Sequence, residues 1–217
     1  YEKGVYRSDD WGASWTELSD SASWSGSPST WDANAFVIDE ESGRFFVAFG
    51  DGGAWGGNED WGLWMSEDCG ASWQRISEGS ELDEEAVLSV ETDGGERVYV
   101  GSWSGYSDTE GGLYVGEQLE TGEWNWHRTL DQPRVPAIAI DPEDPDVVYA
   151  VSGQWFNPVG RQRAGIYRSN DAGETFTLLE RGDLSHLRID NMRFSVHDPD
   201  VLWVGTHGGG MYKGRID

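Results

Sequence analysis

The sequence predicts an all-β fold, a β-propeller with four-stranded antiparallel blades, of which about four are present. Three observations carry this prediction. A motif containing glycine recurs along the chain, pairs of short apolar runs recur between its copies, and the composition combines 13 Trp, 8 Tyr and 7 Phe with 30 Gly. Chains rich in both aromatic residues and glycine are typical of folded β-proteins with many tight turns, whereas disordered chains are poor in aromatic residues.

The recurrent motif is Ser-x-Asp-x-Gly-x-x-aromatic, and it lies in segments 4–15, 62–73 and 165–176. Its residues are Ser8, Asp10, Gly12, Trp15, Ser66, Asp68, Gly70, Trp73, Ser169, Asp171, Gly173 and Phe176. The second and third copies are separated by nearly twice the spacing of the first two, which indicates a period of about 50 residues with a decayed copy between them. The decayed copy lies at 112–126, and a further copy begins at Gly210.

A pair of apolar runs separated by a turn lies upstream of each motif. The runs 137–140 and 147–151, for example, flank an Asp-Pro-Glu-Asp-Pro turn. Short β-rich runs between Asp, Pro and Gly clusters indicate antiparallel strands, and no segment has a sustained helical period. Each period therefore contains four strands, A to D, as is typical of a propeller blade. The predicted units are a partial blade at 1–18, blades at about 35–78, 86–130 and 136–180, and a partial blade at 187–217.

With these boundaries, the chain begins and ends inside blades. We therefore expect either a part of a larger propeller or one half of a ring that two chains complete, since joining the two ends would duplicate strand C. An open propeller exposes sheet faces and strand edges, so self-association is also expected.

The aspartate of each motif is expected to brace the turn between strands C and D. An Asp side chain can accept backbone N–H bonds within such a turn, and Gly permits a positive φ. The aromatic residue then opens strand D and packs beneath the loop. The alternative interpretation of these carboxylates is calcium binding or catalysis. Cys69 occupies a variable position of the second copy and is expected to have no role of its own.

The Ser-x-Asp-x-Gly-x-x-Trp pattern resembles the Asp-box, or bacterial neuraminidase repeat. Segments 144–150 and 204–212 are also similar to repeats of that superfamily, so the resemblance covers nearly the whole chain. It implies a propeller of the sialidase, xyloglucanase or sortilin type. It does not imply one activity, because the motif belongs to the scaffold of propellers with unrelated functions. The boxes would lie on the face of the A–B and C–D turns, and a ligand site on the opposite face, among the B–C and D–A loops.

The charge of the chain limits its partners. The formal net charge is −25, with 40 acidic residues against 15 basic ones. The negative electrostatic field of such a chain repels phosphate groups, which excludes nucleic acid and anionic membrane surfaces as partners. Lys3 and Lys213 are the two lysines. An acidic, lysine-poor surface resembles proteins of salt-loving archaea, so we expect the fold to depend on concentrated salt, which screens self-repulsion.

The single cysteine excludes an intrachain disulfide. The sequence contains no run of about 18 apolar residues that would predict insertion into a membrane, and it shows no recognisable signal peptide. The four His residues have no metal-ligand spacing, and no cofactor motif is found, so we expect neither metal nor cofactor, with calcium at the turns as the alternative left open.

Candidate ligand-binding residues lie in the B–C loops, which combine aromatic rings with polar groups and glycine. These residues are Trp55, Trp61, Trp103, Tyr106, Trp155, Arg161, Arg163 and His207. Arg134, Arg188 and Asp190, near the starts of A strands, could converge with Asp32 on one ligand at the channel mouth. Rings and ions of this kind contact sugars or protein partners. The alternative is that the rings pack on neighbouring blades and the charges form salt bridges between blades.

These loops favour a non-catalytic binding propeller for a glycan or protein ligand, outside the cell or on its surface. One alternative is a fragment of a glycoside hydrolase, sialidase-like or xyloglucanase-like, which needs two carboxylates at a set separation. The candidates for those carboxylates are Asp32, Asp51, Asp60 and Asp108. Another alternative is a structural or assembly scaffold whose exposed propeller edges are the interface.

Overall fold

The computed structural model describes residues 5–18, 33–50, 61–83, 85–103, 111–153, 164–179 and 188–216. Within these ranges the regular structure consists of β-strands alone, and every strand pairing is antiparallel. The all-β propeller predicted from the repeats is confirmed.

The strands form five sheets whose strand order follows the chain. A hairpin consists of β1 (Tyr6–Arg7) and β2 (Thr16–Glu17). The next sheet contains β3 (Ala33–Ile38), β4 (Phe45–Phe49), β5 (Gly62–Ser66) and β6 (Gln74–Arg75). Another four-stranded sheet contains β7 (Ala86–Thr92), β8 (Arg97–Trp103), β9 (Leu113–Gln118) and β10 (Trp124–Leu130).

Two further sheets complete the described fold. One contains β11 (Ala137–Ile140), β12 (Val148–Ser152), β13 (Gly165–Ser169) and β14 (Thr177–Leu178). The other contains β15 (Ile189–Phe194), β16 (Val201–Thr206) and β17 (Gly210–Arg215). Each sheet is thus a meander in which successive strands pair, as a propeller blade requires.

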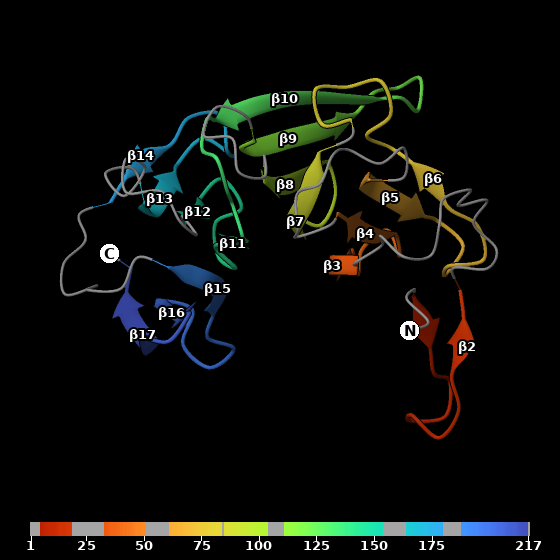
Figure 1. The fold of residues 1–217 in the computed structure, drawn as a ribbon, viewed down its shortest axis with the longest axis horizontal. Coiled ribbons are helices and arrows are strands. Elements are labelled where there is room, and N and C mark those ends of the chain that lie inside the picture. The colour runs from red at the N-terminus through yellow and green to blue at the C-terminus, as the bar shows by residue number, and fades with distance from the viewer. Residues whose placement is uncertain are drawn as a thin grey trace.

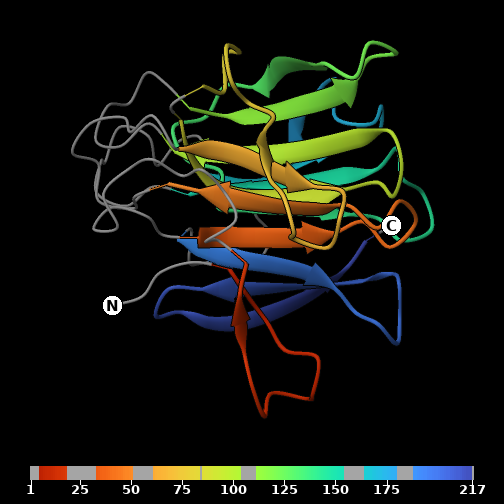
Figure 2. The same cartoon turned by 90° about the vertical axis from the view of Figure 1, so that its right-hand side faces the viewer.

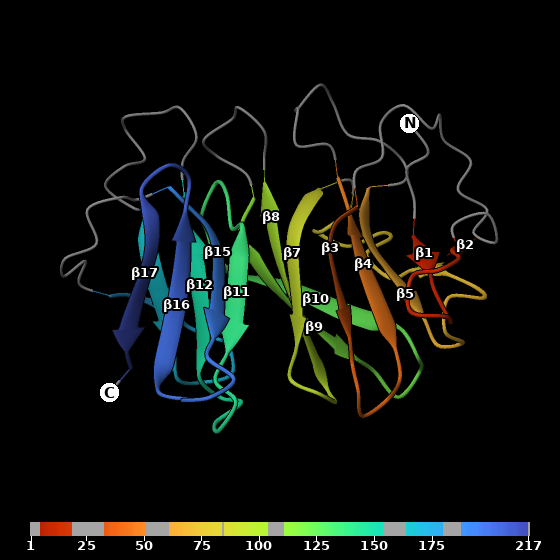
Figure 3. The same ribbon diagram turned by 90° about the horizontal axis from the view of Figure 1, so that it is seen from below.

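The sheets fan around a common centre (Figure 1), with the β1–β2 hairpin at one end of the arc and β15–β17 at the other. The first strand of each larger sheet lies on the concave side, and β3, β7, β11 and β15 contact one another in that order (Figure 3). We call these four the inner strands. Turned by 90°, the same ribbon shows the β1–β2 hairpin extending below the strands of the larger sheets (Figure 2).

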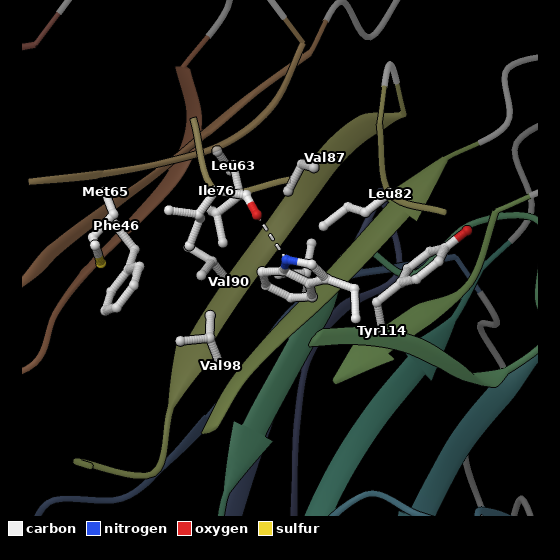
Figure 4. Close-up of a cluster of buried hydrophobic side chains, with 12 residues drawn as sticks. Phe46, Leu63, Met65, Ile76, Leu82, Val87, Val90, Val98 and Tyr114 are labelled. Carbon is white, nitrogen blue, oxygen red and sulfur yellow. Dashed lines mark hydrogen bonds between the residues drawn. The ribbon is translucent and has the colours of Figure 1, made fainter. Parts of the chain in front are cut away.

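The hydrophobic core lies between neighbouring sheets. One cluster joins the β3–β6 sheet to the β7–β10 sheet and includes Phe46, Leu63 and Tyr114 (Figure 4). Two similar clusters fill the next two junctions. Alternate side chains of β8 pack on opposite faces of its sheet, so that Val98 and Val100 belong to the first cluster and Tyr99 to the second. Strands buried on both faces are nearly continuous apolar runs for this reason.

Glycine near the end of the second strand of a blade lets neighbouring blades approach closely. At Gly101 an added Cβ would lie 2.1 Å from the Val135 carbonyl oxygen of the next blade, and at Gly50 it would lie 2.7 Å from Cα of Ala86. Contacts this short exclude a side chain at these positions, so the glycines set the spacing of the inner strands.

Candidate functional site

The turns that carry the Ser-x-Asp motif are closed by their own side chains. In the second copy, Ser66 Oγ donates to Asp68 Oδ1 (2.9 Å) and accepts from the Gly70 N–H (2.8 Å). Asp68 also accepts the Ser72 N–H through Oδ1 (2.7 Å) and the Ser72 hydroxyl through Oδ2 (2.6 Å). The turns around Asp10 and Asp171 repeat these contacts. The carboxylates therefore have their oxygens engaged within the turn.

These hydrogen bonds favour the charged form of each aspartate. The hydroxyl and then the backbone N–H of Ser14 contribute most to lowering the pKa of Asp10, to about 2. Ser72 has the largest effect at Asp68, and the motif's own serine at Asp171, and both pKa values are lowered. A general acid needs the opposite shift, so these groups are suited to turn closure.

The residue before the motif glycine has a backbone conformation that the motif pattern did not predict. Trp11, Cys69 and Ala172 have φ values of 60°, 59° and 54°. L-residues adopt this left-handed region at a cost of about 1–2 kcal/mol. The turn thus needs two successive left-handed residues, and the position of Cys69 is conformationally constrained.

A second group of polar residues lies where the inner strands begin. Arg134 precedes β11 and forms an isolated antiparallel bridge with Trp103, the last residue of β8. Asp190 is the second residue of β15, and His207 directly follows β16. We call Arg134, Asp190 and His207 the rim cluster. Asp190 lies at the start of β15, the end of the strand opposite the β15–β16 turn.

The rim cluster joins two blades through an ion pair and a contact of a histidine ring with the same carboxylate. Arg134 Nη2 lies 3.2 Å from Asp190 Oδ1, and His207 Nδ1 lies 3.2 Å from Asp190 Oδ2. The exposed fraction rises along the network, from 11% for the Arg134 side chain to 34% for Asp190 and 57% for His207. The network therefore leads from the interior to the surface.

Burial lowers the pKa of Arg134, the Asp190 carboxylate opposes this shift, and the positive charge of Arg188 adds to it. A buried cation is tolerated when a carboxylate pairs with it. The sequence leaves open whether Arg134 and Asp190 converge on one ligand or form a salt bridge between blades, and the structure contains that salt bridge.

The aromatic candidates differ in their surroundings. Trp61 is 6% exposed and packs in the interior, so its ring is not presented to a ligand, whereas Trp103 is half-buried. The remaining aromatic and arginine candidates, Trp55, Tyr106, Trp155, Arg161 and Arg163, lie outside the described residues. So do the four carboxylate candidates, Asp32, Asp51, Asp60 and Asp108.

A cavity of about 330 Å³ extends from Asp190 along the inner strands. It is lined by residues of all four inner strands, including Asn34 and Phe36 of β3 and Asn191 of β15. Phe36 and Asn191 were missed as candidates because they belong to strands that the apolar pattern assigns to the core. No signal in one sequence distinguishes a strand side chain that faces a neighbouring blade from one that faces the channel.

Over the described ranges, no group of three or more His, Cys, Asp or Glu residues could hold a metal ion. Nor do those ranges contain a helix long and apolar enough to cross a membrane.

The fold and the meander of each sheet define the chain as a β-propeller. No protein-family model and no curated protein matches the sequence. The structure is similar to the GH74 xyloglucanase from Xanthomonas campestris, with a TM-score of 0.70 and 19% identity over 99% of this chain and 34% of that one. It is also similar to a GH74 enzyme from Niastella koreensis, with a TM-score of 0.65 and 17% identity over 97% of this chain and 33% of that one.

A third similar structure is YCF48 bound to D1 peptide, with a TM-score of 0.59 and 15% identity over 99% of this chain and 59% of that one. The chain thus spans about a third of the length of the two GH74 structures. At these identities the likeness establishes the propeller fold and no activity.

Proposed function

We propose that the chain is a non-catalytic binding propeller that holds a glycan at the rim cluster, outside the cell or on its surface. The observation that carries this proposal is the pairing of Asp190, whose two oxygens are engaged by Arg134 and His207. A carboxylate that is held in place by two partners can orient the hydroxyl groups of a ligand. A glycosidase general acid must instead carry a proton.

Two further observations support a neutral glycan. The net charge of −25 disfavours anionic ligands. The half-buried ring of Trp103 adjoins Arg134 through the bridge between their backbones, which places an aromatic side chain at the same edge as the cluster. The peptide bound to YCF48 makes a peptide ligand the competing outcome.

A fragment of a glycoside hydrolase is the second candidate, and the likeness to the GH74 structures favours it. In that case two of Asp32, Asp51, Asp60 and Asp108 would supply the acid and its partner. Their separation would then decide between retention and inversion, at about 5–5.5 Å or about 6.5–9.5 Å.

The test is calorimetric titration of the chain, in molar salt, with neutral oligosaccharides, acidic oligosaccharides and short peptides. His207→Ala should weaken binding of the neutral oligosaccharides by about three- to tenfold, since one polar contact contributes about 0.5–1.5 kcal/mol. His197→Ala, an exposed histidine in the β15–β16 turn, is the matched control and should leave binding unchanged.

Release of new reducing ends from the same oligosaccharides is measured in parallel. Hydrolysis by the purified chain that is lost in a variant of one carboxylate candidate would replace the binding proposal with the enzyme. Binding of peptides alone would retain the binding propeller and reject the glycan.

A further inference from the structure

The inner strands share an irregularity that the repeat pattern does not reveal. In β3, β7 and β15 the pairing register shifts near the start of the strand, which leaves Asn34, Leu88 and Asp190 as extra residues in the ladder. In β11 the same place is held by Pro136, which precedes the first paired residue and has no N–H to pair. Such β-bulges re-aim a side chain and are found next to functional sites.

All four of these positions line the 330 Å³ cavity on the inner strands. The same bulge occurs in three blades, and a proline takes its place in the fourth. Each blade thereby contributes one residue at this position to the wall of the cavity. Its volume lies at the lower end of the range of about 300–1,000 Å³ that small-molecule pockets occupy.

The bulge of β3 is fixed across the blade junction. Asn34 Nδ2 donates to the carbonyl oxygens of Gly50 (2.9 Å) and Val87 (2.7 Å). Both bonds use the amide nitrogen and so fix the orientation of the side-chain carbonyl oxygen of Asn34. At the next junction, Ser89 Oγ donates to the Val135 carbonyl oxygen (2.9 Å). The cavity wall is therefore preorganised by contacts between blades.

The chemistry of the lining is that of a site for an uncharged, hydroxylated ring. Phe36 exposes 69% of its surface and offers an aromatic face. The amides of Asn34 and Asn191 and the carboxylate of Asp190 supply donors and acceptors around it. A few placed polar groups beside an apolar surface are typical of ligand pockets.

An ion pair bounds the cavity on the side away from the rim. Glu91 of β7 pairs with Arg193 of β15, across the intervening strand β11. The same two residues also line a second cavity, of about 450 Å³, whose other residues include Asp141 and Pro142 in the β11–β12 turn. The pair thus stands between the two cavities along the inner strands.

We infer that this cavity binds a single residue of a neutral glycan, with the sugar ring against Phe36 and its hydroxyl groups on Asn191 and Asp190. The inference rests on the proposed function, since the rim cluster would contact the next sugar unit outward.

The experiment compares wild-type chain with Phe36→Ala and Asn191→Ala by calorimetric titration of cellobiose, cellotetraose and xyloglucan oligosaccharides in molar salt. We expect cellobiose and cellotetraose to bind with dissociation constants within about fivefold of each other, because one unit in the cavity and one at the rim cluster provide most of the contact. Phe36→Ala should raise the dissociation constant by about three- to tenfold. Phe36→Tyr keeps the aromatic face and should restore binding.

Ile38→Ala is the matched control, because Ile38 is an exposed apolar residue of the same strand, 45% exposed, and does not line the cavity. It should change the dissociation constant by less than about twofold. Circular dichroism of each variant checks that the fold is retained.

The outcomes separate the two proposals. If oligosaccharides bind, and His207→Ala weakens their binding while Phe36→Ala and Asn191→Ala do not, the glycan site at the rim cluster stands and binding in the cavity is refuted. Affinity that rises steadily from cellobiose to longer chains would refute recognition of a single unit in the same way. If no neutral oligosaccharide binds wild-type chain, the proposed function fails and the inference fails with it.

Discussion

Trp126 is expected to connect two blades, and its replacement by phenylalanine tests the packing between them. The residue lies on β10, is 7% exposed, and donates through Nε1 to the carbonyl oxygen of Ile76 in the preceding blade at 2.8 Å (Figure 4, dashed line). Its ring rests on Gly116, where an added Cβ would lie 2.5 Å from a ring carbon. Trp126→Phe therefore removes a donor and leaves space beside a backbone.

The magnitude follows from these two losses. A buried carbonyl that loses its donor costs about 1–3 kcal/mol, and the smaller ring adds about 1 kcal/mol or more for the space it leaves. We expect the free energy of unfolding to fall by about 2–4 kcal/mol. For a chain of this size the midpoint temperature should then fall by about 4–16 °C.

The assay is denaturant and thermal unfolding in molar salt, followed by circular dichroism. Trp11→Phe is the matched control, because the Trp11 side chain is fully exposed, and it should change the free energy of unfolding by less than about 0.5 kcal/mol. A loss of less than about 1 kcal/mol for Trp126→Phe would refute the argument that this contact holds the two blades together.

Three further predictions concern turns, glycines and salt. Asp10→Ala should destabilise the chain at neutral pH. Because the folded pKa of Asp10 is about 2, below its ordinary 3.8, its contribution is complete above about pH 4 and is lost as the pH falls towards 2, so the midpoint temperatures of variant and wild type should converge there. Gly101→Ala should prevent folding or lower the midpoint temperature markedly, because its Cβ would lie 2.1 Å from the Val135 carbonyl oxygen. Gly95→Ala is the control and should leave the midpoint unchanged, because no atom lies within 4 Å of its added Cβ. Equal midpoint temperatures for the two variants would contradict the close approach at Gly101. The midpoint temperature of wild type should rise between 0.1 M and 1 M salt, as the Debye length shrinks from about 10 Å to about 3 Å around a net charge of −25, and a midpoint independent of salt would exclude dependence of the fold on salt.

The local features were accessible from the sequence because they depend on neighbours in the chain. Asp68, Gly70 and Ser72 are four residues apart or less, so their turn closes without reference to the rest of the fold. The left-handed backbone at Cys69 was not predicted, because glycine is the residue type from which a positive φ is inferred in a sequence, and Cys69 is not a glycine. The sequence left two alternatives open for Trp61, ligand contact and packing, because a loop position next to a strand shows no period that separates inside from outside.

The sequence by itself determined that the chain forms antiparallel sheets of about four strands at a period of about 50 residues, since hydrophobic runs and turns repeat at that spacing. The tertiary structure decided which groups meet. Arg134 and Asp190, which lie 56 positions apart, pair only because two blades set their inner strands side by side. The bulges at Asn34, Leu88 and Asp190 are likewise a property of strand register, which is set by the packing of one blade on the next and leaves no mark in the order of the residues.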